Sequence, residues 1–240
     1  MVTKTIERNG VNFLVNYSTK NSSFWDIEGW EKNNYDLILK LSESVKTFVH
    51  AGGWVGPFTL FASKLFDRVI TLEPDPIAYD ELKTNINLNK FENIIFLNKG
   101  FSNTNDKITI GSDYGLGRSD TSIFNNNNSV DVECCTVRDI YEEYNINEST
   151  LLMFDVEGSE FKLFDDFHFY EKYKPHIILS LHLSWLTDEN FDYMFNGLSK
   201  LSTIYDFDLE SILDMRKLIP YKSSFFEKNI LLTPKILTIN

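Results

Sequence analysis

Hydrophobic positions follow two alternating patterns along most of the chain. Short apolar runs of strand length are followed by stretches in which apolar residues recur with a helical period. The runs predict buried strands at residues 47–51, 69–73, 94–98, 151–156 and 176–182. The helical stretches cover residues 58–66, 77–89, 138–144, 160–167 and 189–201. This alternation is typical of an α/β fold, in which helices cover both faces of a parallel sheet.

Local signals support these elements and add strands of a second kind. Asp75 as N-cap and Pro76 at the first helical position mark the start of the second helix. Three segments alternate apolar and polar residues with a period of two: "DKITIGS", "VDVECCTV" and "FFEKNILLTP". The last, paired with "TIYDFDL", predicts an antiparallel C-terminal hairpin. We therefore predict a Rossmann-like three-layer sandwich with a mostly parallel seven-stranded sheet.

Two segments lie outside the alternation. Residues 1–44 predict a short strand pair and a helix, "NNYDLILKLSESV", which we interpret as a cap on the ligand-binding edge of a single domain at 45–240. Residues 111–128 form a long loop rich in Gly, Ser and Asn. A loop of this length inside a compact domain is often functional. We expect it to be mobile without substrate and to order over the acceptor.

Length and charge narrow the class of protein. A chain of 240 residues is suited to one α/β domain, and its formal net charge of −12 disfavours nucleic-acid and anionic membrane partners. The sequence shows no signal peptide and no apolar run long enough to span a membrane, so we expect a cytoplasmic protein. The cysteines, Cys134 and Cys135, are adjacent, which suits neither a disulfide nor a zinc site.

A glycine-rich turn follows the first predicted core strand. Gly52, Gly53 and Gly56 in "HAGGWVG" would present backbone N–H groups at the start of a helix. The turn lacks the G-x-G-x-x-G order that dinucleotide binding uses, whereas Glu73 ends the next strand, where a carboxylate binds a ribose diol. The combination favours S-adenosylmethionine (SAM) as cofactor. The alternative is ordinary turn chemistry with an exposed acid at a strand end.

Polar residues also end the later core strands. Asp155 and Glu157 follow the fourth strand and His182 ends the fifth, so all three should lie at the carboxyl edge of the sheet. We predict them as catalytic residues, with His182 as the base that accepts a hydroxyl proton. Structural alternatives stay open: Glu157 could complement a helix dipole, and His182 could be a core-edge histidine. Asp155 and His182 alone do not make a metal site, so none is predicted.

Four segments together resemble one enzyme family. "HAGGWVGPFTLFASKL", "VITLEPDPIAYDELKTNINLN", "LLMFDVEGSEF" and "PHIILSLH" are similar, in order and spacing, to motifs of the FkbM family of class I SAM-dependent methyltransferases. The "GRSDTSIF" segment also resembles that family. The resemblance implies that SAM is bound by His50, Gly52, Gly53, Gly56, Glu73, Asp75 and Ser102. The chain departs from the family pattern where His50 and Arg138 replace the usual acids.

The resemblance implies a specific activity. The expected reaction is O-methylation of a hydroxyl on a carbohydrate or small metabolite, so the expected partner is a small-molecule or glycan acceptor. Two alternatives remain. A nicotinamide-dependent oxidoreductase is disfavoured by the missing G-x-G-x-x-G, and a catalytically silent SAM- or nucleotide-binding module is suggested by His50.

Overall fold

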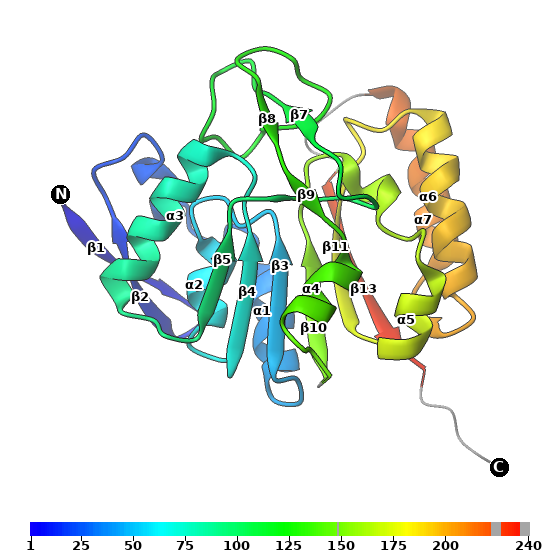
Figure 1. Cartoon of the computed structure of the whole chain (residues 1–240), viewed down its shortest axis with the longest axis horizontal. Helices are drawn as coiled ribbons and strands as arrows, with labels where there is room; N and C mark the ends of the chain where they lie inside the picture. The colour runs from blue at the N-terminus through cyan, green and yellow to red at the C-terminus, as the bar shows by residue number, and fades with distance from the viewer. Residues whose placement is uncertain (148, 222–226, 236–240) are drawn as a thin grey trace.

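A central sheet forms the middle of the protein. The computed structural model describes residues 1–147, 149–221 and 227–235, and in these residues the main sheet has seven strands in the order β12-β13-β11-β10-β3-β4-β5 (Figure 1). Its strands are β3 (Thr47–Ala51), β4 (Arg68–Leu72), β5 (Ile94–Leu97), β10 (Thr150–Phe154), β11 (His176–His182), β12 (Tyr205–Asp206) and β13 (Glu227–Pro234). Because β13 runs antiparallel to both β11 and β12, the other six strands point the same way.

Helices cover both faces of this sheet. One face is covered by α1 (Lys32–Ser42), α2 (Pro57–Ala62) and α3 (Pro76–Asn89). The other is covered by α4 (Val137–Glu143), α5 (Phe167–Tyr173), α6 (Asp188–Leu201) and α7 (Leu209–Met215). Successive residues of β3 show why two cores form, since Phe48 packs into the first and Val49 into the second. The predicted three-layer α/β sandwich is confirmed.

The C-terminal strand pair differs from a simple hairpin. The predicted antiparallel pairing is present between β12 and β13. However, α7 and the 3-10 helix η3 (Arg216–Tyr221) lie between the two strands in sequence. β13 also pairs with β11, along its other edge. The first two residues of the predicted strand "FFEKNILLTP" lie outside the described residues.

One predicted helix is wrong. In place of a helix over 160–167, the chain forms a short 3-10 helix, η2 (Ser159–Lys162), and then starts α5 at Phe167. Asp166 caps α5, because its side chain accepts the Phe169 N–H at 3.1 Å. The apolar pattern runs through both elements and so concealed the break. The helix predicted over 58–66 also ends early, at Ala62.

The N-terminal segment forms the elements that the sequence predicts. A hairpin of β1 (Thr3–Arg8) and β2 (Val11–Asn16) is followed by the 3-10 helix η1 (Ser22–Asp26) and α1. Asn85 and Asn89 of α3 accept backbone N–H groups of β2 at 2.7 and 2.8 Å, which joins the hairpin to that helix. The segment therefore packs into the core on the α1–α3 face. Its division from the rest of the chain as a separate cap stays a prediction.

Two small strand pairs lie above the carboxyl edge of the main sheet. β7 (Ile108–Ile110) pairs with β8 (Val130–Val132), and β6 (Gly100–Phe101) pairs with β9 (Cys134–Cys135). Figure 1 shows β7 and β8 at the top of the molecule. Both cysteines are buried and free, and burial raises the pKa of Cys135 to about 12. Among the described helices, none is long and apolar enough to cross a membrane.

Candidate functional site

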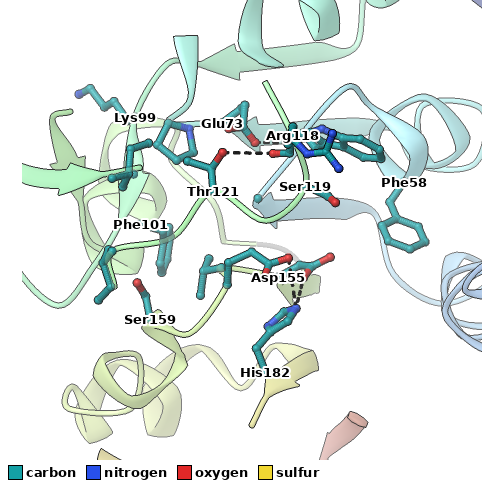
Figure 2. A pocket seen from close by; sticks show the side chains of 18 of the residues that line it. Phe58, Glu73, Lys99, Phe101, Arg118, Ser119, Thr121, Asp155, Ser159 and His182 are labelled. Atoms are coloured by element: carbon teal, nitrogen blue, oxygen red, sulfur yellow. Dashed lines mark hydrogen bonds and ion pairs between the residues drawn. The ribbon is translucent and has the colours of Figure 1, made fainter. Parts of the chain in front are cut away.

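A cavity opens at the carboxyl ends of β3, β4 and β10, beneath the 111–128 loop (Figure 2). Its walls come from elements far apart in the sequence, including the glycine turn, the ends of β4 and β10, and the loop. The predicted site residues that line it are Gly52, Glu73, Asp155, Glu157 and His182. Parallel strands deliver these side chains to one edge, which is where open α/β sheets bind ligands.

Glycine is required at the turn by a close approach of backbone to backbone. Gly52 has φ +92°, and a Cβ at that position would lie 1.7 Å from the carbonyl oxygen of Asp155. Gly56 has φ +107°, and its Cβ would meet Leu82 of α3 at 2.9 Å. A side chain at Gly56 would therefore collide with Leu82 and Leu60. Its role in binding the cofactor stays a prediction. Gly53 faces Thr71 and also lies outside the cavity lining.

Glu73 is buried, with its carboxylate held by two backbone groups. The Trp54 N–H donates to Oε2 at 2.6 Å, and the Asp75 N–H donates to Oε1 at 2.8 Å. Burial raises the pKa of Glu73 to about 8, although these two hydrogen bonds oppose the shift. A carboxylate oriented in this way on the cavity wall can accept hydrogen bonds from the hydroxyls of a ribose.

The three predicted catalytic residues lie together. His182 Nε2 is 3.3 Å from Asp155 Oδ1 (Figure 2). The same nitrogen is 3.5 Å from Glu157 Oε1. Its other ring nitrogen, Nδ1, is 2.6 Å from Oε1 of Glu160, a fully buried acid on η2. Glu157 has φ +48° and is further held by Trp185, whose indole N–H donates to Oε2 at 3.2 Å. The four side chains form one polar cluster, three of whose members line the cavity.

Electrostatics within this cluster argue against His182 as a general base. Burial by itself lowers the pKa of His182, but the charges of Glu157, Glu160 and Asp155 raise it well above its ordinary value. An imidazolium has no lone pair with which to accept a proton. Both ring nitrogens also face carboxylates, so neither is directed at an acceptor. For the acid Glu157, burial has the opposite effect and raises the pKa to about 8, although the positive charge of His182 opposes this shift.

The 111–128 loop forms the roof of the cavity through Arg118, Ser119, Thr121 and Ile123. It is attached at several points. The Gly117 N–H and the Thr121 hydroxyl both donate to Asp75 Oδ2, the latter at 3.0 Å. The Ser122 hydroxyl donates to the Glu157 carbonyl at 2.6 Å. The structure therefore connects the roof to Asp75, the acid that caps α3, and to the backbone of Glu157. Whether the loop moves before substrate binds stays a prediction.

Besides Gly53 and Gly56, three predicted cofactor residues lie outside the cavity lining. His50 is buried beneath the turn, 3.4 Å from Thr59 Oγ1, and burial lowers its pKa to about 3. Asp75 uses one carboxylate oxygen to cap α3 and the other to hold the loop. Ser102 lies beside a second cavity, between α4 and η2, near Arg138. Their side chains therefore support the fold around the site and do not line it.

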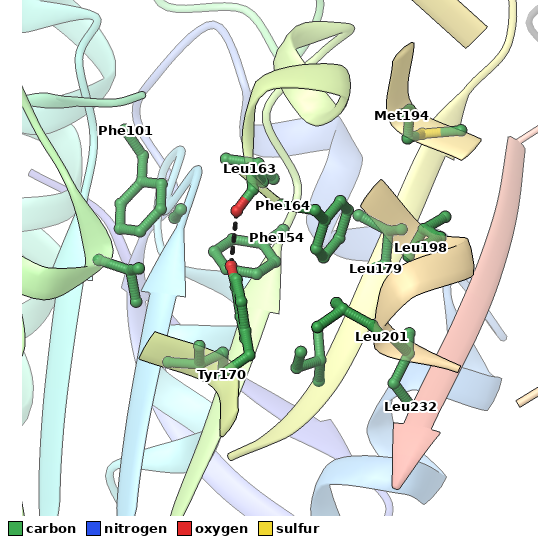
Figure 3. Close-up of a cluster of buried hydrophobic side chains, with 14 of the residues drawn as sticks. Phe101, Phe154, Leu163, Phe164, Tyr170, Leu179, Met194, Leu198, Leu201 and Leu232 are labelled. Carbon is green, nitrogen blue, oxygen red and sulfur yellow. Dashed lines mark hydrogen bonds between the residues drawn. The ribbon is translucent and has the colours of Figure 1, made fainter. Parts of the chain in front are cut away.

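Sequence reasoning missed several residues that the structure brings to the site. Lys99, Phe101 and Arg118 line the cavity, and Glu160 supports His182. Phe101 also packs on Phe154 with ring centroids 5.3 Å apart, which joins the cavity floor to the hydrophobic core (Figure 3). The "GRSDTSIF" motif was the available signal for Arg118. No sequence signal pointed to Glu160, because this residue stood at the start of the helix predicted over 160–167.

Comparisons with known proteins identify the family of this chain. A family model described as the methyltransferase FkbM domain matches residues 50–223. Methyltransferase FkbM from Methylobacillus flagellatus KT is 17% identical, with a TM-score of 0.46, over 68% of this chain and 39% of that one. The chain thus spans less than half of that relative's length. No curated protein matches the sequence.

Two further solved structures are among the matches. A Streptococcus mutans protein named as a methyltransferase, in complex with SAH, is 10% identical over 87% of this chain and 99% of that one, with a TM-score of 0.49. An rRNA methylase from Streptococcus thermophilus is 9% identical over 88% and 99%, with a TM-score of 0.47.

The family match covers most of the site described above. It spans the glycine turn, Glu73, the acids after β10 and His182. The buried acid that follows β4 and the glycine turn, both on the cavity wall, fit SAM as the cofactor. Membership also excludes the nicotinamide-dependent oxidoreductase that the sequence left open. From the matched region, this chain belongs to the FkbM family of SAM-dependent methyltransferases.

Proposed function

We propose that the enzyme transfers the methyl group of SAM to a hydroxyl of a small acceptor, such as a carbohydrate. The observation that carries this proposal is the cluster of Asp155, Glu157 and His182 on the same cavity as Glu73. Methylation of a hydroxyl requires that its proton be removed or shared, and carboxylates at the cavity wall supply acceptors for that proton. A neutral amine would need no such group to attack.

The reaction is an in-line displacement at the SAM methyl carbon. The acceptor oxygen forms a bond to this carbon while the sulfur–carbon bond breaks, and the electron pair of that bond stays on the sulfur of SAH. The hydroxyl proton passes to a carboxylate of the cluster, of which Asp155 is 23% exposed toward the cavity. The enzyme contributes mainly by holding the two reactants in line.

The cavity wall supports a ring-shaped acceptor of limited size. Trp30 and Phe58 line the cavity and stack with their ring centroids 5.3 Å apart, which provides an apolar face for a sugar ring. The loop roof encloses the space from above, and the net charge of −12 opposes long polyanionic substrates. Both features support a small acceptor or a single glycan residue.

A transfer assay tests the proposal. The enzyme is incubated with methyl-labelled SAM and a panel of sugars, nucleotide sugars and small hydroxylated metabolites, and labelled products are separated from SAH. We expect Asp155→Asn to lower turnover by roughly 10²-fold while SAM affinity stays within about twofold. Asp165→Asn, an acid at the second cavity, serves as control. Transfer only to nitrogen or carbon acceptors would contradict O-methylation, and SAM binding without transfer would indicate a silent module.

A further inference from the structure

We propose that Asp155, Glu157 and His182 form a binding site for a divalent cation of the manganese type. Among the described residues, these three bring one ligand atom each to within 4.8 Å of one another. The inference rests on the proposed function, since the ion would lie where the acceptor hydroxyl is expected. It changes the role of the cluster from proton acceptor to metal centre.

The distances within the cluster fit one shared ion. Ligand atoms at about 2.1–2.3 Å from an ion and at right angles to each other lie about 3.0–3.3 Å apart. His182 Nε2 lies 3.3 Å from Asp155 Oδ1 and 3.5 Å from Glu157 Oε1. Small side-chain adjustments therefore suffice to bring the three atoms onto one ion.

Glu160 supplies the support that a ligating histidine needs. Metal-binding histidines commonly donate their second ring N–H to a carboxylate, which fixes the tautomer and the ring orientation. Here the Nδ1 side of His182 faces Glu160 Oε1 at 2.6 Å, so that Nε2 is turned toward the two cavity acids. Glu160 is fully buried, and its Oε2 has no hydrogen-bond partner in the described part of the chain. Glu160 is thus a positioning residue for the proposed ligand.

The charge of the cluster also favours a cation. The carboxylates of Asp155, Glu157 and Glu160 surround the imidazole of His182. Glu160 and His182 are both buried. An excess of negative charge away from water is costly unless a positive ion compensates it. The set of two carboxylates and one imidazole suits an ion that accepts both oxygen and nitrogen ligands, such as Mn²⁺.

The site is open on the side of the cavity. Asp155 and Glu157 are 23% and 21% exposed, whereas the third proposed ligand, His182, is 5% exposed. Three protein ligands leave coordination positions that water or the acceptor hydroxyl would occupy. A hydroxyl on a divalent ion is a stronger acid than a free one, so the ion would both position and acidify the acceptor.

Metal binding is tested directly with Mn²⁺ alone. The full chain is treated with chelator, then titrated with Mn²⁺ by calorimetry and by electron paramagnetic resonance. We expect one ion per chain, and Asp155→Asn and His182→Gln each to weaken binding at least tenfold. His176→Gln, at the opposite end of β11, is the matched control and should bind as wild type. No binding by folded wild-type protein at millimolar Mn²⁺, or unchanged affinity in Asp155→Asn, would overturn the site.

A spectroscopic readout identifies the histidine ligand. Pulsed electron paramagnetic resonance of the Mn²⁺ complex should show coupling of the ion to a ¹⁴N nucleus. This coupling should be absent in His182→Gln and present in His176→Gln. Glu160→Gln should weaken Mn²⁺ binding by about 10- to 100-fold, with its folding checked by thermal melting. If the ligand variants fail to fold, wild-type protein still decides the question, because a bound Mn²⁺ without nitrogen coupling contradicts the proposal.

The outcomes separate this inference from the proposed function. Full methyl transfer to a hydroxyl in excess chelator would support O-methylation and contradict a role for a metal ion in it. Specific Mn²⁺ binding without transfer to any hydroxyl acceptor would retain the metal site and remove the O-methyltransferase proposal.

Discussion

The carboxylate of Asp75 accepts a hydrogen bond at 3.0 Å from the hydroxyl of Thr121, which lies 46 positions further along the chain. The same side chain caps α3 through the N–H of Ile77 at 2.8 Å. One acid therefore stabilises the helix that follows Glu73 and also holds the roof of the cavity. The position of the roof depends on the end of β4 and not on the loop sequence alone.

The first prediction concerns this attachment. Thr121→Val removes the hydroxyl and leaves the α3 cap intact, so we expect faster proteolytic cleavage within 111–128 with little loss of global stability. Asp75→Ala removes both functions and should also lower the free energy of unfolding by about 1 kcal/mol. Thr136→Ala, which removes the cap of α4, is the control for cap loss alone. Equal cleavage rates in Thr121→Val and wild type would contradict the attachment.

A second prediction concerns SAM affinity. Glu73→Ala should weaken SAM binding by roughly 1.5–3 kcal/mol, because the carboxyl group that hydrogen-bonds the two ribose hydroxyls is lost. Calorimetry with SAM measures the effect. Glu81→Gln is a suitable control, since this partly buried acid on α3 binds Thr19 and Asn21 and does not line the cavity. An unchanged dissociation constant in Glu73→Ala would remove this residue from the cofactor site.

The third prediction uses the pKa of Glu73. Because burial raises this pKa to about 8 from an ordinary value of 4.5, the folded protein keeps a proton that the unfolded chain releases. The stabilisation that this bound proton gives to the folded state is fully present below pH 4.5 and is lost as the pH rises toward 8. Between pH 5 and 8, wild type should lose roughly 3–4 kcal/mol more unfolding free energy than Glu73→Gln, because one unit of pKa difference is worth about 1.4 kcal/mol. The two slopes are compared by chemical denaturation, and parallel slopes would contradict the shift.

The fourth prediction concerns the glycine turn. Gly52→Ala places a methyl group against the Asp155 carbonyl, where a Cβ would lie 1.7 Å from the oxygen. We expect a loss of more than about 3 kcal/mol of stability or failure to fold. Gly115 also has a positive φ of +87°, but its Cβ would meet nothing within 4 Å, so Gly115→Ala isolates the conformational cost. Thermal melting should rank Gly52→Ala far below Gly115→Ala.

The fifth prediction concerns His50. Its Nε2 is buried without a hydrogen-bond partner among the described residues, and its ring does not line the cavity. His50→Leu replaces the ring with an apolar side chain, so SAM affinity should stay within about twofold of wild type and stability should be equal or higher. A tenfold loss of SAM affinity in a stable variant would restore the cofactor role that the sequence suggested.

Much of the fold was predictable because it depends on local patterns. The runs that became β3 and β11 were found with their observed bounds, and the Asp75 cap located the start of α3. Periodicity failed at residues 160–167, where two short elements share one apolar pattern and the new cap at Asp166 breaks the helix. Buried side chains at these positions are satisfied by either geometry, so hydrophobic pattern alone does not distinguish them.

The sequence by itself determined that polar residues end neighbouring parallel strands, which is why Glu73, Asp155 and His182 were found to share one edge. Only the tertiary structure decided what each can do. It placed Glu160 behind His182, which changes the charge of the ring, and it directed Asp75 toward the loop. A strand pattern specifies which edge a residue reaches. The protonation and the partners of a side chain depend on groups that other segments bring within a few ångströms, and that information is absent from any local stretch of sequence.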